Sequence, residues 1–170
     1  MIFEIKNVLT ERKIKKLYDD LLGSRSWHLK STYGDGSNPY PNLPVTFDHN
    51  PLNPHWHSYF QGLYHGINSM LYQQYAFDLG DLEPSTISIN AQKKGHHYVF
   101  HDHQNYRYVI VGFLTPEWEE EWGGELQVEG ETIKFKPGNF ILFKGDKLHD
   151  AMIIKNEIPY WRISVGIFIK

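Results

Sequence analysis

From residue 85 onward the sequence is a series of short β-prone segments separated by turn residues. The most strongly β-prone segment is 107–114, where β-branched and aromatic residues dominate. Turn dipeptides such as Pro137-Gly138 and Gly145-Asp146 separate the segments. The other expected strands contain Ile87, Ile89 and Val99, or cover 125–129, 132–136, 140–143, 149–154 and 161–169. Many short strands in series, with helices ahead of them, predict a sheet sandwich or barrel with helical support.

The helical patterns lie in the first 80 residues. A short strand at 2–6 precedes a helix expected over 11–22, which Thr10 can cap and Gly23 can end. A second helix is expected at about 55–77, because apolar residues recur there at helical spacing. These residues are Phe60, Leu63, Tyr64, Ile67, Leu71 and Tyr75.

Residues 33–54, between the two predicted helices, are rich in proline and glycine. Proline interrupts long regular elements, and a loop of this length in a compact domain is usually a lid, a binding loop or a disordered segment. Aromatic residues also lie in this segment or next to it: Tyr33, Tyr40, Phe47 and Trp56. We therefore expect a partly ordered lid at 33–57 that covers a substrate, the alternative being a meandering surface loop.

Composition narrows the function class. The chain has 170 residues, the size of one domain, and we expect a single domain with a helical front at 1–80 and a barrel core at 85–170. It has a net charge of −3 and no extended basic cluster, which argues against nucleic acid as a partner. It contains no cysteine, which excludes disulfides and thiolate metal sites. No signal pattern or membrane-length apolar run is found, so we expect a cytoplasmic protein without a membrane partner.

Histidines are concentrated in a motif that runs from Gly95 to His103. In an extended segment residues i and i+2 share a face, so His101 and His103 point together while Asp102 points away. His149 follows a turn and can come from a facing strand. Two ligands at i and i+2 plus one distant ligand present a metal with three donors on one side and leave positions open for substrates. The alternative is a chance arrangement among the ten histidines of the chain.

Arg162 and Ser164 form a second polar pair on one face of the last predicted strand. Ile163 and Val165 alternate with them and are expected to enter a core layer. A buried arginine offers two parallel donors to a carboxylate, although most arginines are ordinary salt-bridge partners. Gly123-Gly124 precedes no helix N-terminus and is better explained by backbone conformation than by phosphate binding.

The order of these motifs carries a resemblance. Over residues 87–170 the chain reads Gly95-x-x-Tyr98-x-x-His101-x-His103, then Phe113-Leu114-Thr115, Trp122-Gly123-Gly124-Glu125-Leu126, Pro137-Gly138, His149 and Arg162-Ile163-Ser164. This series resembles the iron(II)/2-oxoglutarate-dependent oxygenases, specifically the prolyl 4-hydroxylase-like group. The resemblance implies a double-stranded β-helix (jelly roll), mainly β with N-terminal helices.

The resemblance also implies roles for individual residues. His101 and His149 match the two iron-binding histidines, and Arg162 matches the residue that pairs with the distal carboxylate of 2-oxoglutarate. Ser164 matches the hydrogen-bonding neighbour of that arginine, and Tyr98 matches a tyrosine near the cosubstrate. His103 stands where the family has an aspartate ligand, which makes the expected metal set His101, His103 and His149.

The expected function follows from these matches. The chain resembles a dioxygenase that uses iron(II) and 2-oxoglutarate as cofactors and dioxygen as a substrate to hydroxylate a peptide, prolyl residues included, or a small molecule. Because of His103 two alternatives stay open. One is a three-histidine iron dioxygenase that does not use 2-oxoglutarate, and the other is a jelly-roll binding module without catalysis.

Overall fold

The structure is a computed structural model that describes residues 1–31, 39–96 and 99–170. Its elements in chain order are β1 (Ile2–Ile5), α1 (Glu11–Leu22), β2 (His28–Ser31), β3 (Pro39–Phe47), β4 (Asn50–Pro51), α2 (Pro54–Tyr75), β5 (Pro84–Gln92), β6 (Tyr108–Phe113), η1 (Glu120–Trp122), β7 (Leu126–Val128), β8 (Glu131–Ile133), β9 (Phe140–Lys144), β10 (His149–Ala151) and β11 (Arg162–Ile169). The described chain is mainly β with helices near its N-terminus, as predicted.

The strands form two antiparallel sheets. In the described part of the chain the larger sheet has eight strands in the order β1-β9-β6-β11-β5-β3-β2, with β4 paired to β3, and the smaller has the order β10-β7-β8. Some neighbours in the large sheet are far apart in the sequence, since the C-terminal β11 lies between β5 and β6 and β1 pairs with β9. This two-sheet arrangement confirms the predicted jelly roll.

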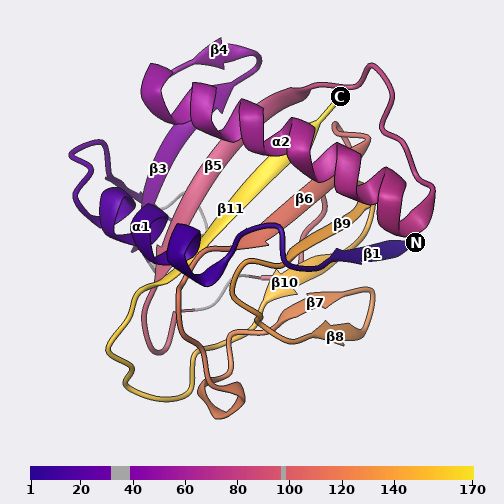
Figure 1. The fold of residues 1–170 in the computed structure, drawn as a ribbon. Helices are drawn as coiled ribbons and strands as arrows, with labels where there is room; N and C mark the ends of the chain where they lie inside the picture. Colours follow the sequence, from indigo (N-terminus) through magenta and orange to yellow (C-terminus); the bar gives the residue numbers. More distant parts are fainter. Residues whose placement is uncertain (32–38, 97–98) are drawn as a thin grey trace.

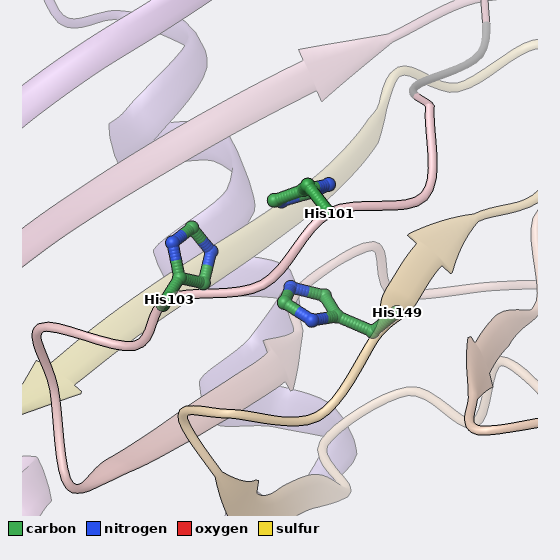
Figure 2. Close-up of side chains that lie close together, drawn as sticks. All are labelled: His101, His103 and His149. Atoms are coloured by element: carbon green, nitrogen blue, oxygen red, sulfur yellow. The ribbon is translucent and has the colours of Figure 1, made fainter.

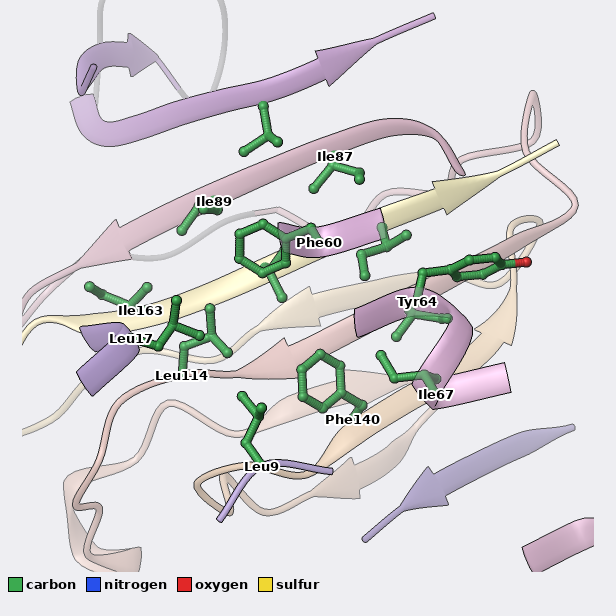
Figure 3. Packing of buried hydrophobic residues seen from close by; sticks show 14 of the residues in the cluster. Leu9, Leu17, Phe60, Tyr64, Ile67, Ile87, Ile89, Leu114, Phe140 and Ile163 are labelled. Carbon is green, nitrogen blue, oxygen red and sulfur yellow. The ribbon is translucent and has the colours of Figure 1, made fainter. Parts of the chain in front are cut away.

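The two helices cover one face of the large sheet (Figure 1). The second begins at Pro54, where Asn53 caps it by accepting a hydrogen bond from the Trp56 backbone N–H at 3.3 Å. Phe60 and Ile67 are fully buried against the sheet (Figure 3). Full burial of one such side chain stabilises by about 2 kcal/mol, so this apolar stripe holds the helix in place.

Alternation along β11 separates two environments. Ile163, Val165, Ile167 and Ile169 enter the core beneath the helices, as the sequence predicts for the first two. Arg162 and Ser164 face the other side, toward the small sheet, where Phe113, Leu126, Phe135 and Phe143 belong to a second core. The large sheet thus buries apolar side chains on both faces, and the face toward the small sheet also carries polar ones, such as Ser88, Asn90 and Ser164.

The predicted lid is wrong for residues 39–51. This segment is β3 and β4, and β3 is nine residues long despite Pro39, Pro41 and Pro44. Pairing with β5 on one side and β2 on the other overrides the local effect of proline, and the β3–β5 register shifts between Pro44 and Thr46.

Other details also differ from the sequence prediction. Trp56 is buried in the helix-side core and does not belong to a lid. Val99 lies outside the strands, because β5 ends at Gln92. Tyr33 lies outside the described residues. No helix among the described residues is long and apolar enough to cross a membrane.

Candidate metal centre

Three histidine side chains converge on the side of the large sheet that faces the small sheet. His101 and His103 come from the segment between β5 and β6, and His149 is the first residue of β10 (Figure 2). One ring nitrogen from each side chain lies within 4.8 Å of the others. The sequence therefore identified a group that the fold brings together, although its local structure differs from the expected strand: His101 makes an isolated β-bridge and His103 belongs to no strand.

The backbone fixes the separation of two of these histidines. The His101 N–H donates to the His149 carbonyl oxygen at 3.1 Å, and the His149 N–H donates to the His101 carbonyl oxygen at 2.9 Å. The two ring centroids are 4.4 Å apart. This reciprocal pair holds a loop residue in register with the small sheet.

Two backbone carbonyls fix the orientation of the rings. His101 Nδ1 lies 2.8 Å from the Val99 carbonyl oxygen, and His149 Nδ1 lies 2.9 Å from that of Lys147. A carbonyl oxygen can only accept, so each Nδ1 carries the proton and each neutral ring keeps its lone pair on Nε2. This is how metal-binding histidines are usually oriented.

His103 is held differently. Within the described part of the chain its ring makes no hydrogen bond, and it packs edge-on against Phe168 with centroids 4.7 Å apart. The side chain at the position where the resemblance expects an aspartate is thus oriented by aromatic packing alone.

Burial keeps two of these rings neutral. It lowers the pKa of His103 to about 3, with the nearby His149 and His101 acting in the same direction. It also lowers the pKa of His149 to about 4, against the opposing effect of the hydrogen bond with Lys147. A metal needs unprotonated imidazole, so the site suits a divalent cation at neutral pH.

Asp102 does not join the cluster. Its Oδ2 accepts a hydrogen bond from Gln104 Nε2 at 2.9 Å, and the group within 4.8 Å consists of the three histidines. Three neutral imidazoles bring no negative charge, whereas two imidazoles and a carboxylate bring one. A dication held here keeps its full charge, which strengthens its attraction for anionic ligands.

A cavity of about 570 Å³ connects the histidines with Arg162 and Ser164. All five residues line it, together with residues of β3, β5 and β6. The alternation of side chains along the predicted strand placed Arg162 and Ser164 on one face, and in the structure that face lines the cavity. Both side chains are buried, at 1% and 8% exposure.

Neighbouring groups hold the Arg162 guanidinium in one orientation. Its Nε donates to the Gly124 carbonyl oxygen at 2.9 Å and its Nη1 donates to Gln92 Oε1 at 2.6 Å. The guanidinium also lies over the Phe135 ring, 5.2 Å from its centroid. An arginine fixed in this way is pre-organised for a carboxylate.

Gly124 leaves room for this arginine. It has a φ of +75°, and a Cβ there would lie 3.1 Å from Arg162 Cδ and 2.9 Å from the Trp118 ring. A requirement of backbone conformation was predicted for Gly123-Gly124, and the positive φ of both residues confirms it.

Two elements of the site were not predicted from the sequence. One is the packing role of Gly124. The other is Gln92, for which a signal existed: Ile87, Ile89 and Ala91 enter the core, so Ser88, Asn90 and Gln92 belong to the opposite, cavity-facing side. Tyr98, predicted near a cosubstrate, lies outside the described residues.

Comparison with known proteins supports the resemblance. Residues 87–170, about half of the chain, match the family model described as the 2OG-Fe(II) oxygenase superfamily. No curated protein matches the sequence. Iron(II) and 2-oxoglutarate, the predicted cofactors, are those that the superfamily's name specifies.

Solved structures share the fold along the whole chain. An oxidoreductase of the 2OG-Fe(II) oxygenase family from Burkholderia pseudomallei has a TM-score of 0.77 at 13% identity, over 99% of this chain and 85% of that one. A prolyl-4-hydroxylase from Pseudomonas putida has a TM-score of 0.67 at 15% identity, over 99% and 92%. A prolyl hydroxylase from Trichoplax adhaerens, in complex with a hypoxia inducible factor peptide fragment, has a TM-score of 0.68 at 14% identity, over 99% and 82%. At these identities the likeness concerns the fold.

Proposed function

We propose that this chain, which has the sequence motifs and the fold of the 2OG-Fe(II) oxygenase superfamily, is an iron(II)- and 2-oxoglutarate-dependent dioxygenase that acts on a peptide or a small molecule. One observation carries the proposal: a single cavity has three convergent histidines and a buried, oriented arginine-serine pair among its lining residues. We propose that residues 1–170 act as one domain.

The histidine group fits an iron(II) ion. His101, His149 and His103 would hold it, the first two through Nε2, since their Nδ1 atoms are engaged by carbonyls. Bound iron(II) and 2-oxoglutarate would together supply the activation of dioxygen. The chain contributes position and neutral donors, because burial disfavours protonation of His103 and His149.

Arg162 and Ser164 would bind the carboxylate of 2-oxoglutarate that is remote from the metal. The guanidinium lies on a wall of the cavity, and its Nε and Nη1 are already oriented by Gly124 and Gln92. Because the arginine is almost fully buried, its attraction for a carboxylate is screened little by solvent.

His103 favours a second candidate, a three-histidine iron dioxygenase that binds its substrate without 2-oxoglutarate. Both candidates use the same metal ligands and differ in what Arg162 does. In the second candidate Arg162 holds the fold together or contacts the substrate directly.

Anaerobic titration separates the candidates. Metal-free protein is titrated with iron(II) and then with 2-oxoglutarate, and visible absorption is followed. A new metal-to-ligand charge-transfer band that is absent in Arg162→Met supports the 2-oxoglutarate-dependent enzyme. Iron binding without that band favours the three-histidine dioxygenase, and absence of iron binding refutes both and leaves the binding module.

The His103→Asp variant sharpens this test. It restores the carboxylate that the family has at this position, so it should strengthen iron binding and raise succinate release in a 2-oxoglutarate-dependent enzyme. In a true three-histidine dioxygenase it should reduce activity. His65→Asp is a matched control, because His65 is an exposed residue of α2 that does not line the cavity.

The substrate class and location remain predictions. The peptide complex of the Trichoplax adhaerens structure makes a peptide a reasonable first candidate here, alongside small molecules. A cytoplasmic location, without a nucleic acid or membrane partner, is what the sequence predicts.

A further inference from the structure

A row of polar side chains crosses the cavity wall beside the arginine site. Asn42 of β3, Asn90 of β5 and Ser164 of β11 stand opposite one another in the strand register, and all three line the cavity. Neighbouring strands lie about 4.8 Å apart, so the row spans about 10 Å. Ser88, two residues before Asn90, shares its face and also lines the cavity. The proposed cosubstrate engages Ser164 and leaves the other three side chains available.

One atom, Asn42 Nδ2, holds these three residues together. It donates to Ser88 Oγ at 2.7 Å, to Asn90 Oδ1 at 2.7 Å and to the Ile89 carbonyl oxygen at 3.2 Å. A carbonyl oxygen can only accept, so the Asn42 atom beside Ile89 is the amide nitrogen. The Asn90 atom beside that nitrogen must then be an oxygen. The contact with Ile89 therefore fixes the orientation of both asparagine side chains.

This orientation leaves three polar groups unused. Within the described residues Asn42 Oδ1 accepts no hydrogen bond, and neither the Asn90 amide nitrogen nor the Ser88 hydroxyl donates one. The two asparagine atoms are still accessible, since neither is among the buried side-chain atoms that lack a partner. Asn42 is only 7% exposed, and Asn90 and Ser88 are half-buried. Because all three side chains line the cavity, their free groups can be satisfied by what fills it.

The unused groups match an amide. Asn42 Oδ1 can accept a hydrogen bond from an N–H group, while Asn90 Nδ2 and Ser88 Oγ can donate to a carbonyl oxygen. None of the three side chains is charged, so a carboxylate or an ammonium ion would lose hydration there without gaining an ionic partner. Val111 and Leu126 also line the cavity and suit an apolar group beside the amide.

We infer that Asn42, Ser88 and Asn90 bind an amide group of the substrate, next to the cosubstrate held by Arg162 and Ser164. This inference rests on the proposed function, since it assigns a feature of the substrate of that same site. The three residues determine specificity because an amide satisfies both the acceptor and the donors. An ester of the same shape has no N–H group and leaves Asn42 Oδ1 without a partner.

The test uses cyclohexanecarboxamide as a probe and methyl cyclohexanecarboxylate as its counterpart without an N–H group. Each is titrated into the isotope-labelled full chain, loaded with zinc(II) and saturated with 2-oxoglutarate, and the side-chain amide resonances are followed by NMR. The amide should bind at least about fivefold more tightly than the ester, the scale of one hydrogen bond, and should shift the side-chain resonances of Asn42 and Asn90. Equal binding of the two compounds, or binding that leaves both resonances in place, overturns the inference.

The Asn90→Leu variant locates the contact. Leucine is close to asparagine in size, and Asn42 Nδ2 keeps Ser88 Oγ and the Ile89 carbonyl oxygen as acceptors for its two protons. The variant should therefore fold, which circular dichroism checks, and should bind the amide at least about fivefold more weakly. Asn156→Leu is the control, because Asn156 is exposed and does not line the cavity. An unchanged affinity in folded Asn90→Leu overturns the assignment, and if the variant does not fold, the resonance shifts of the wild type decide.

The same titrations keep the two proposals apart. If 2-oxoglutarate fails to bind the zinc-loaded protein, the proposed function fails, while the preference for the amide over the ester still tests the asparagine contacts. If the amide binds only without 2-oxoglutarate and is displaced by it, Asn42, Ser88 and Asn90 belong to the cosubstrate site. That result refutes the inference about the substrate.

Discussion

The Gln92→Glu variant tests the arginine site most directly. Gln92 Oε1 accepts a hydrogen bond from Arg162 Nη1 at 2.6 Å, and both side chains are 1% exposed. The variant keeps the shape of the side chain and replaces its amide with a carboxylate. The guanidinium then holds a permanent anion on one edge.

The expected effects on folding and on binding have opposite signs. A buried arginine gains a charged partner, so the free energy of unfolding should be unchanged or higher. A second carboxylate on another edge of the guanidinium would lie about 6 Å from the first, and at an effective dielectric constant of about 20 the two repel by about 3 kcal/mol. The affinity for 2-oxoglutarate should therefore fall about a hundredfold.

Calorimetric titration of the zinc-loaded protein with 2-oxoglutarate measures the binding, and thermal unfolding measures the stability. Gln127→Glu serves as the control, because it adds the same charge at a half-buried site on β7 that does not line the cavity. An unchanged affinity in stably folded Gln92→Glu would refute the reasoning, since Arg162 could then not be the group that binds the carboxylate. A parallel loss of stability and binding would instead mean that Gln92 acts through the fold.

Three further predictions concern the same site. Gly124→Ala should destabilise the fold by about 1–3 kcal/mol more than Gly130→Ala, because both have positive φ but only at the first does a Cβ approach the arginine; equal losses in chemical denaturation would contradict this. Metal-free protein should lose stability as the pH falls from 6.5 toward 4, because the pKa of His149 is lower in the folded than in the unfolded chain and protons therefore bind the unfolded chain first. The loss through His149 alone should be about 3 kcal/mol. A free energy of unfolding that stays constant over that pH range would refute this prediction. His149→Gln should weaken iron(II) binding at least about tenfold in a competition assay with a chelator, whereas His65→Gln, on α2, should not.

Sequence patterns predicted the parts of the site that alternate or recur. His101 and His103 were identified from their spacing, and Arg162 and Ser164 from parity along a strand that the structure confirms. The parity of Arg162 and Ser164 survives folding because it depends on local strand geometry alone, whereas His101 and His103 converge although their segment is not the expected strand.

The remaining parts depend on contacts between distant segments. β3 exists because β5 and β2 pair with it, which proline-rich local sequence does not foretell. The role of Gly124 follows from the approach of Arg162, which is 38 residues away in the chain. Gln92 could have been identified, since alternation along β5 puts it on the same face as Ser88 and Asn90, which line the cavity, but its significance appears only beside the arginine.

The reciprocal hydrogen bonds between His101 and His149 bring together two residues that are far apart in the chain, and this pairing has a consequence for stability. A metal held by both residues would cross-link the chain across a loop of about 50 residues, and by the loop-closure treatment such a link removes about 4 kcal/mol of chain entropy from the unfolded state. The loop contains β6 through β9, which belong to both sheets. The metal-bound protein would thus resist proteolysis longer than the metal-free protein, whether or not it catalyses a reaction.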